Sequence, residues 1–182
     1  MTTTSKPAPP PAAVAADAHW AAKMDRLRTR KLAQAVFRVC DDPEVRERYA
    51  RAVRAEEVAR TYADANPDDK EAATEAAAAA AKLAEAKTAY EDVSVPLTFR
   101  ALPRPAYEAL LKEHKPSEEQ ADDGREWDDT FPAALIAAAS VDGMTEPEAQ
   151  ELLDTWSLAE ANDMFNAAFS VQHTTRTDLG KG

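Results

Sequence analysis

Residues 145–171 read TEPEAQELLDTWSLAEANDMFNAAFSV and contain the strongest folding signals in the chain. Two capping-box patterns, Thr145–Glu148 and Ser157–Glu160, place a hydroxyl and a carboxylate three residues apart, where they satisfy the free N–H groups at a helix start. Because the boxes lie close together, they predict two short helices that meet at a corner near Trp156. The apolar residues of these helices share faces at helical spacing: Ala149, Leu152, Leu153 and Trp156, then Leu158, Ala161, Phe165, Ala168 and Phe169.

Shorter elements precede this pair of helices. Thr130-Phe-Pro is a helix start and predicts a helix over Phe131–Ala139, and a further short helix is expected over Pro105–His114. The acidic loop between them contains Trp127, which we expect to fold back as an anchor. Residues 93–102 alternate apolar and polar side chains around a proline, which indicates a short edge strand near 95–101 or an extended linker.

The N-terminal half is predicted to be helical and contains few large side chains. A first helix is predicted over Val14–Val39 and is ended by Asp41-Asp42-Pro43, which also begins the next helix. That second helix fades near Asn66-Pro67, where a third begins and runs to about Tyr90. The third helix contains the alanine run at 76–81. Residues 43–90 are therefore predicted to form a helical hairpin or a loose coiled-coil arm.

These elements predict a mainly all-α fold. An Ala-rich N-terminal helical arm, residues 13–92, is followed by a compact C-terminal bundle of short helices, residues 93–172. A Pro-rich disordered tail is expected at 1–12 and a flexible tail at 173–182.

Charge and composition restrict the class of partner. The 182 residues have a formal net charge of −11. Residues 1–60 contain 12 basic and 8 acidic groups, a net of +4, whereas residues 61–182 contain 10 basic and 25 acidic groups, a net of −15. The acidic part repels nucleic acid. The alanine run is too short and weakly apolar to span a bilayer, so we expect neither a nucleic-acid nor a membrane partner.

No residue pattern indicates catalysis, a cofactor or a metal. The three histidines are far apart, and the single cysteine, Cys40, lies beside two aspartates, whose negative charge argues against a reactive nucleophile. The four glycines form no phosphate-binding loop. The acidic cluster at 122–129 misses the spacing of a calcium loop. The sequence therefore predicts a protein that is not an enzyme.

The remaining signal is a set of large apolar side chains in the C-terminal module. Most of them are expected to bury one another, but a module of short helices leaves room for one open groove that accepts a partner helix. The candidate partner-binding residues are Phe99, Leu102, Tyr107, Trp127, Phe131, Leu135, Leu152, Trp156, Phe165 and Phe169.

Three stretches of this module resemble the tail assembly chaperones of actinobacterial siphophages. They are FRALPRPAYEALL at 99–111, WDDTFPAALIAAAS at 127–140, and residues 148–171, which include WSLAE and FNAA. The resemblance covers about 75 of the 182 residues and leaves the N-terminal arm uncovered.

The resemblance implies a role in building a phage tail. Such chaperones bind the long tape-measure protein, keep it soluble in the host cytoplasm, and are absent from the mature virion. A longer form made by ribosomal frameshifting is thought to recruit tail-tube subunits. Two other interpretations remain open: a structural or scaffolding virion protein that acts through its helical arm, and an unrelated cytosolic adaptor. The sequence does not give the oligomeric state, and a homo-oligomer that forms a ring or spiral around a tape-measure protein is compatible with the chaperone interpretation.

The gene sequence tests the frameshift. Leu179-Gly180-Lys181 can be encoded CTG GGA AAG, which contains the slippery heptamer GGGAAAG. We expect this heptamer at these codons, followed by an overlapping −1 reading frame. Other codons there, or no overlapping frame, would exclude a longer product made at this site.

Overall fold

The computed structural model describes residues 11–175, with side chains from His19 onward. The tails predicted at 1–12 and 173–182 lie outside this range except for residues 11–12 and 173–175, and so does the frameshift site. In this part of the chain the protein is mainly helical with one small two-stranded sheet, which confirms the predicted fold class. The elements are α1 (Pro11–Arg28), β1 (Gln34–Val39), α2 (Pro43–Ala65), α3 (Lys70–Val93), β2 (Val95–Arg100), α4 (Arg104–Glu113), α5 (Glu118–Asp122), α6 (Phe131–Ala139), α7 (Glu146–Thr155), α8 (Leu158–Ser170) and a 3₁₀ turn at Val171–His173.

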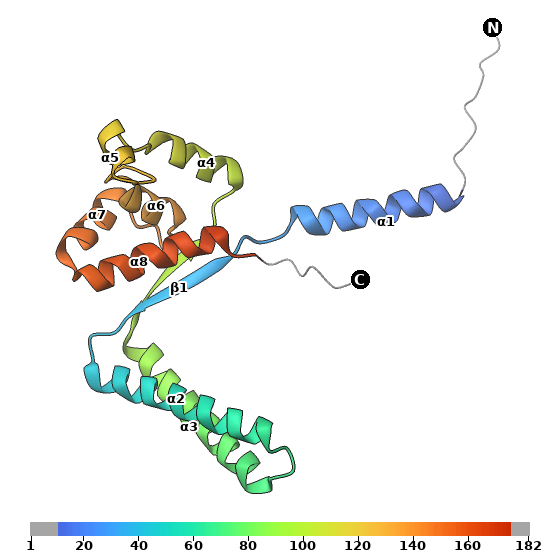
Figure 1. Cartoon of the computed structure of the whole chain (residues 1–182). Helices are drawn as coiled ribbons and strands as arrows, with labels where there is room; N and C mark the ends of the chain where they lie inside the picture. Colours follow the sequence, from blue (N-terminus) through green and yellow to red (C-terminus); the bar gives the residue numbers. More distant parts are fainter. Residues whose placement is uncertain (1–10, 176–182) are drawn as a thin grey trace.

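The sheet joins segments that are far apart in the sequence. β1 pairs antiparallel with β2, with Ala35 opposite Phe99 and Val39 opposite Val95. The strand predicted near 95–101 is thus confirmed. The long α2–α3 hairpin is inserted between the two strands and extends away from them (Figure 1). The domain boundary predicted at residue 93 assigns β1 to the N-terminal arm. In the structure β1 instead pairs with β2, the first strand of the C-terminal module.

The helix predicted over Val14–Val39 is wrong in its second half. α1 ends at Arg28, and residues 34–39 are a strand. The sequence QAVFRV places Val36 and Val39 three residues apart, which also fits a helix face, but β-branched and aromatic residues at alternating positions favour a strand once a partner is available. That partner lies more than fifty residues away and is invisible to local pattern reasoning.

Aspartates begin both helices of the hairpin. Asp42 Oδ1 accepts from the backbone N–H of Glu44 at 2.9 Å, as the sequence predicted for α2. The predicted start of the next helix at Asn66-Pro67 is wrong: Asn66 closes the C-terminal end of α2, where its side-chain amide donates to Tyr62 O at 2.8 Å. Asp69 caps α3 instead. The N-cap of this helix is therefore Asp69, three residues after the predicted Asn66.

The two hairpin helices meet along a seam of small residues. Reduced exposure recurs at alternating steps of three and four residues along both helices, the spacing of a coiled coil. Alanine at most of these positions lets the helices lie close together, and Ala72 and Ala86 are buried. The seam positions are Val45, Tyr49, Ala52, Glu56, Ala59 and Ala63 of α2 and Ala72, Ala76, Ala79, Leu83, Ala86 and Tyr90 of α3.

The base of the hairpin is fastened to β1. Tyr49 and Tyr90 stack with ring centroids 4.8 Å apart, and the Tyr90 hydroxyl donates to Arg38 O at 3.5 Å. Burial, more than the neighbouring charges, raises the pKa of Tyr90 and keeps this phenol protonated as a donor. The Arg38 guanidinium also pairs with Glu91 at 3.6 Å. These contacts join the arm to the sheet without a large apolar interface.

The core of the module lies around α6. Phe131, Leu135 and Ile136 of α6 are fully buried, as are Phe99 of β2 and Met164 of α8. A short helix that is apolar on all sides is stable only when it is enclosed, and α4, α7, α8 and β2 surround it (Figure 1). The predicted start of α6 and the corner at Trp156 are confirmed. So are the capping boxes at Thr145 and Ser157, and Ser117 forms a further box at the start of α5.

The hairpin seam predicts which alanine tolerates a larger side chain. Ala86→Leu adds methylene groups to a buried contact and should destabilise the hairpin by about 1–3 kcal/mol. Ala84→Leu, the matched change on the exposed side of the same helix, should change stability by less than about 0.5 kcal/mol. Urea unfolding followed by helical circular dichroism measures both. Equal effects of the two variants would contradict the seam.

Candidate partner-binding site

The predicted partner-binding residues fall into three groups. Phe99, Phe131 and Leu135 have no exposed surface. They form the core, so a partner cannot reach them in the folded module. The other seven are half-buried and lie at three separate places: an aromatic cluster, the far edge near α4, and a groove beside the sheet.

The aromatic cluster closes one side of the core. The ring of Trp127 lies 4.8 Å from that of Phe131, 6.0 Å from Phe165 and 5.5 Å from Phe169. Trp127 therefore anchors the acidic loop against α6 and α8, as the sequence predicted. These rings stabilise the module chiefly by packing on one another.

Asp128 fixes the chain where this loop enters α6. Its Oδ1 accepts from the Thr130 hydroxyl at 2.7 Å and from the N–H groups of Thr130 and Phe131 at 2.9 and 3.1 Å. The hydroxyl hydrogen bond is the largest cause that lowers the pKa of Asp128, and His114 Nδ1, 3.5 Å away, adds to it. Asp128 does the work of an N-cap although it stands three residues before the helix.

Tyr107 and Leu102 lie at the far edge, near the C-terminal turn. The Tyr107 hydroxyl is 3.4 Å from His173 Nε2, and the Leu102 N–H donates to Gln172 Oε1 at 2.8 Å. These contacts hold α4 and the 3₁₀ turn together. The His173 ring centroid also lies 4.7 Å from that of Phe169, so this edge adjoins the aromatic cluster.

Leu152 and Trp156 line an open groove of about 490 Å³, which we call the module groove. Its apolar wall is completed by Val39, Val95 and Leu97 on the inner face of the sheet. Val95 is 61% exposed because no helix covers this end of the sheet. The side chains of Phe37 and Trp156, with ring centroids 6.4 Å apart, connect the groove to the core.

Two carboxylates lie on the rim of the module groove. They are Asp41, before α2, and Glu160, in the first turn of α8. The Ser157 hydroxyl and backbone N–H lower the pKa of Glu160, with a smaller contribution from Arg46. The groove therefore combines an apolar floor with an acidic edge. Leu152 and Trp156 were among the residues predicted from the sequence, but Val39 and Val95 were not, because Val39 was assigned to a helix and Val95 to a strand at the domain boundary.

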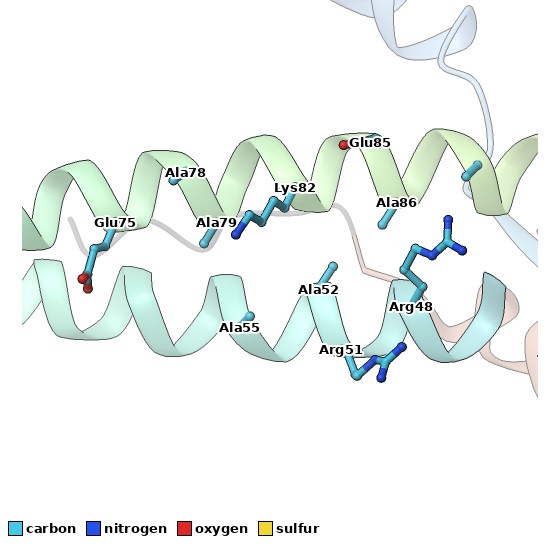
Figure 2. A pocket seen from close by; sticks show the side chains of 11 residues that line it. Arg48, Arg51, Ala52, Ala55, Glu75, Ala78, Ala79, Lys82, Glu85 and Ala86 are labelled. Atoms are coloured by element: carbon cyan, nitrogen blue, oxygen red, sulfur yellow. The ribbon is translucent and has the colours of Figure 1, made fainter. Parts of the chain in front are cut away.

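A second groove, of about 570 Å³, follows one face of the hairpin (Figure 2). Its floor consists of small side chains, including Ala52, Ala55 and Ala79. Arg48 and Arg51 stand at one end, while Glu75 stands at the other (Figure 2). The sequence signal for this groove was the alanine run, which belonged to the predicted helical hairpin or loose coiled-coil arm and indicated no binding residue.

Among the described residues no group of three or more His, Cys, Asp or Glu side chains could hold a metal ion. Cys40 is buried, with its Sγ 3.6 Å from Asp42 O. Within residues 11–175 no helix is both long and apolar enough to cross a membrane. Leu158, expected on the buried face of α8, is instead 79% exposed because it occupies the first position after the corner.

Comparison with known proteins finds no match: no family model, no curated protein and no solved structure matches the chain. The two grooves are thus the features from which a function can be argued.

The Asp128 network predicts a pH-dependent contribution to stability. Because the folded pKa of Asp128 is lowered, the charged carboxylate stabilises the fold at neutral pH. This contribution is lost as the pH falls below about 3.8, the ordinary pKa of an aspartate, towards the folded value. Asp128→Ala should cost about 1 kcal/mol at neutral pH, as for a lost N-cap.

Urea unfolding of the wild type and of Asp128→Ala, at neutral pH and at a pH below about 3.8, measures this contribution to stability. The difference between the two proteins should shrink in acid. Asp129→Ala is the control, because the Asp129 side chain bonds only to the side chains of Arg125 and Gln120 and caps no helix. A pH-independent difference for Asp128→Ala would contradict the assignment.

Proposed function

We propose that this protein is a bacteriophage tail assembly chaperone that binds the tape-measure protein through the module groove. The observation that carries the proposal is the position of Leu152 and Trp156. Both belong to the stretch that resembles such chaperones, and both line an open apolar groove rather than the closed core.

The shape and charge of the module suit this task. A tape-measure protein exposes long apolar helices that aggregate in water, and one apolar face of such a helix fits a groove as anchors three, four and seven residues apart. Residues 101–175 contain 4 basic and 16 acidic groups, a net of −12. This charge keeps a complex with an apolar client soluble.

The proposal includes the place and fate of the protein. It acts in the host cytoplasm as a binding protein rather than an enzyme, and it leaves before the virion is complete. The frameshifted longer form recruits tail-tube subunits to the client that the shorter form holds.

The hairpin groove supports a second candidate function. An alanine-floored groove between two long helices accepts a further helix at close range, which would suit a scaffolding or structural virion protein that assembles through its arm. Mass spectrometry of purified virions separates the two functions, because a structural protein is retained and a chaperone is absent.

Co-expression with the tape-measure protein of the same phage tests the chaperone role. Trp156→Ala removes the central aromatic anchor and should weaken binding by about thirtyfold, the size of a hot-spot loss. Val95→Lys changes a mostly exposed side chain of the same groove and should weaken binding without loss of fold.

Ala55→Lys places a charge in the hairpin groove and is the matched control. It should leave the affinity unchanged. If Ala55→Lys abolishes binding while Trp156→Ala and Val95→Lys do not, the client lies on the hairpin and the module groove has another role. Circular dichroism shows whether each variant keeps its helices.

A further inference from the structure

The first helix presents an apolar stripe to solvent. α1 projects away from the module and the hairpin (Figure 1). Trp20 is 60% exposed and Leu27 is 58% exposed. They are seven residues apart, which places them two turns apart on one face of the helix. Side chains of this size at this spacing are typical anchors of a helix that lies in a groove.

Basic side chains flank this stripe. Lys23, Arg26 and Arg30 line a shallow surface hollow together with Trp20 and Leu27. Residues 19–30 contain four basic groups and one acidic group, Asp25, a net of +3. Asp25 is paired with Arg28 at 3.4 Å, so the cations beside the stripe are left to face a partner.

The module groove has the complementary character. Its floor is apolar, its rim bears Asp41 and Glu160, and it belongs to a module with a net charge of −12 over residues 101–175. One chain thus contains a basic helix with two exposed apolar anchors and an acidic groove that accepts apolar anchors.

We propose that α1 of one copy of this protein docks into the module groove of a second copy. Trp20 and Leu27 contact the apolar floor around Val95 and Trp156. The cations beside them face the acidic rim of the groove. Burial of the tryptophan supplies most of the affinity, and the opposite charges set the orientation and speed the encounter.

The tether of α1 favours a second copy over the same chain. Residues 29–33 connect α1 to the Gln34 end of β1, whereas the groove lies at the Val39 end. Five fully extended residues reach about 17 Å, and β1 itself is about 17 Å long. The linker can therefore only just return to the groove, and α8 covers the inner face of β1 on the way. A second copy has no such limit.

Self-association of the full chain without any client tests this inference, which does not rest on the chaperone role. Sedimentation across a dilution series should show a mass above that of the monomer that falls on dilution and with added salt. Trp20→Ala with Leu27→Ala, both on exposed positions of α1, should weaken the association by about thirtyfold. Val95→Lys in the groove should weaken it as well.

A charge exchange gives the decisive comparison. Lys23→Glu with Arg26→Glu in one protein, and Asp41→Lys in another, should each weaken self-association. Mixing the two proteins should restore it, because the unchanged α1 of the second protein then meets the unchanged groove of the first, and the acidic α1 of the first meets the basic groove of the second. Asp41 is suited to this exchange because Asp42, not Asp41, caps α2.

Three results would overturn the inference. The wild type could remain a monomer at every concentration. Association could persist in all variants, which would place the interface elsewhere, for example on the hairpin. Association could depend on α1 but not on Val95 or Asp41, which would mean that α1 binds another surface. Circular dichroism of each variant shows that a loss of association is not a loss of fold.

Discussion

The antiparallel pairing of β1 with β2 is the constraint on which the rest of the structure depends. It joins residues 34–39 to residues 95–100 across the whole hairpin. An isolated two-stranded sheet is at best marginally stable in water, so this sheet needs support from the elements around it. The module covers the side that bears Phe99 and Phe37. The hairpin brings the strand ends together and ties them through Tyr90 and Arg38.

This pairing also creates the open groove. The Val39–Val95 end of the sheet lies beside the corner between α7 and α8, and there Val95 stays 61% exposed. The corner exists because a capping box restarts the helix at Ser157, directly after Trp156 ends the preceding one. Trp156 is consequently held at the edge of the core with one side in contact with Phe37 and the other on the groove.

The sequence predicted the elements whose signals are local and missed those that depend on distant partners. Caps at Asp42, Thr145 and Ser157 gave helix starts that the structure confirms. β1 was missed because its pattern also fits a helix face, and only β2 makes the strand favourable. For the site, residue type identified Leu152 and Trp156 but could not separate them from Phe99 or Leu135, since an apolar side chain looks the same whether it is buried or exposed.

The two proposals for the module groove are linked, because one surface cannot hold two helices at once. If α1 of a second copy and a client helix compete for Val95 and Trp156, then each weakens the binding of the other by the same factor. A copy without a client would then have its apolar floor covered by a neighbour rather than exposed to water. The neighbour brings a basic helix to an acidic module, so this self-complex is weakened by salt. A client that buries more apolar area displaces α1 without any change in the fold of the module, and the exposed stripe on α1 is then free again to bind the groove of another copy.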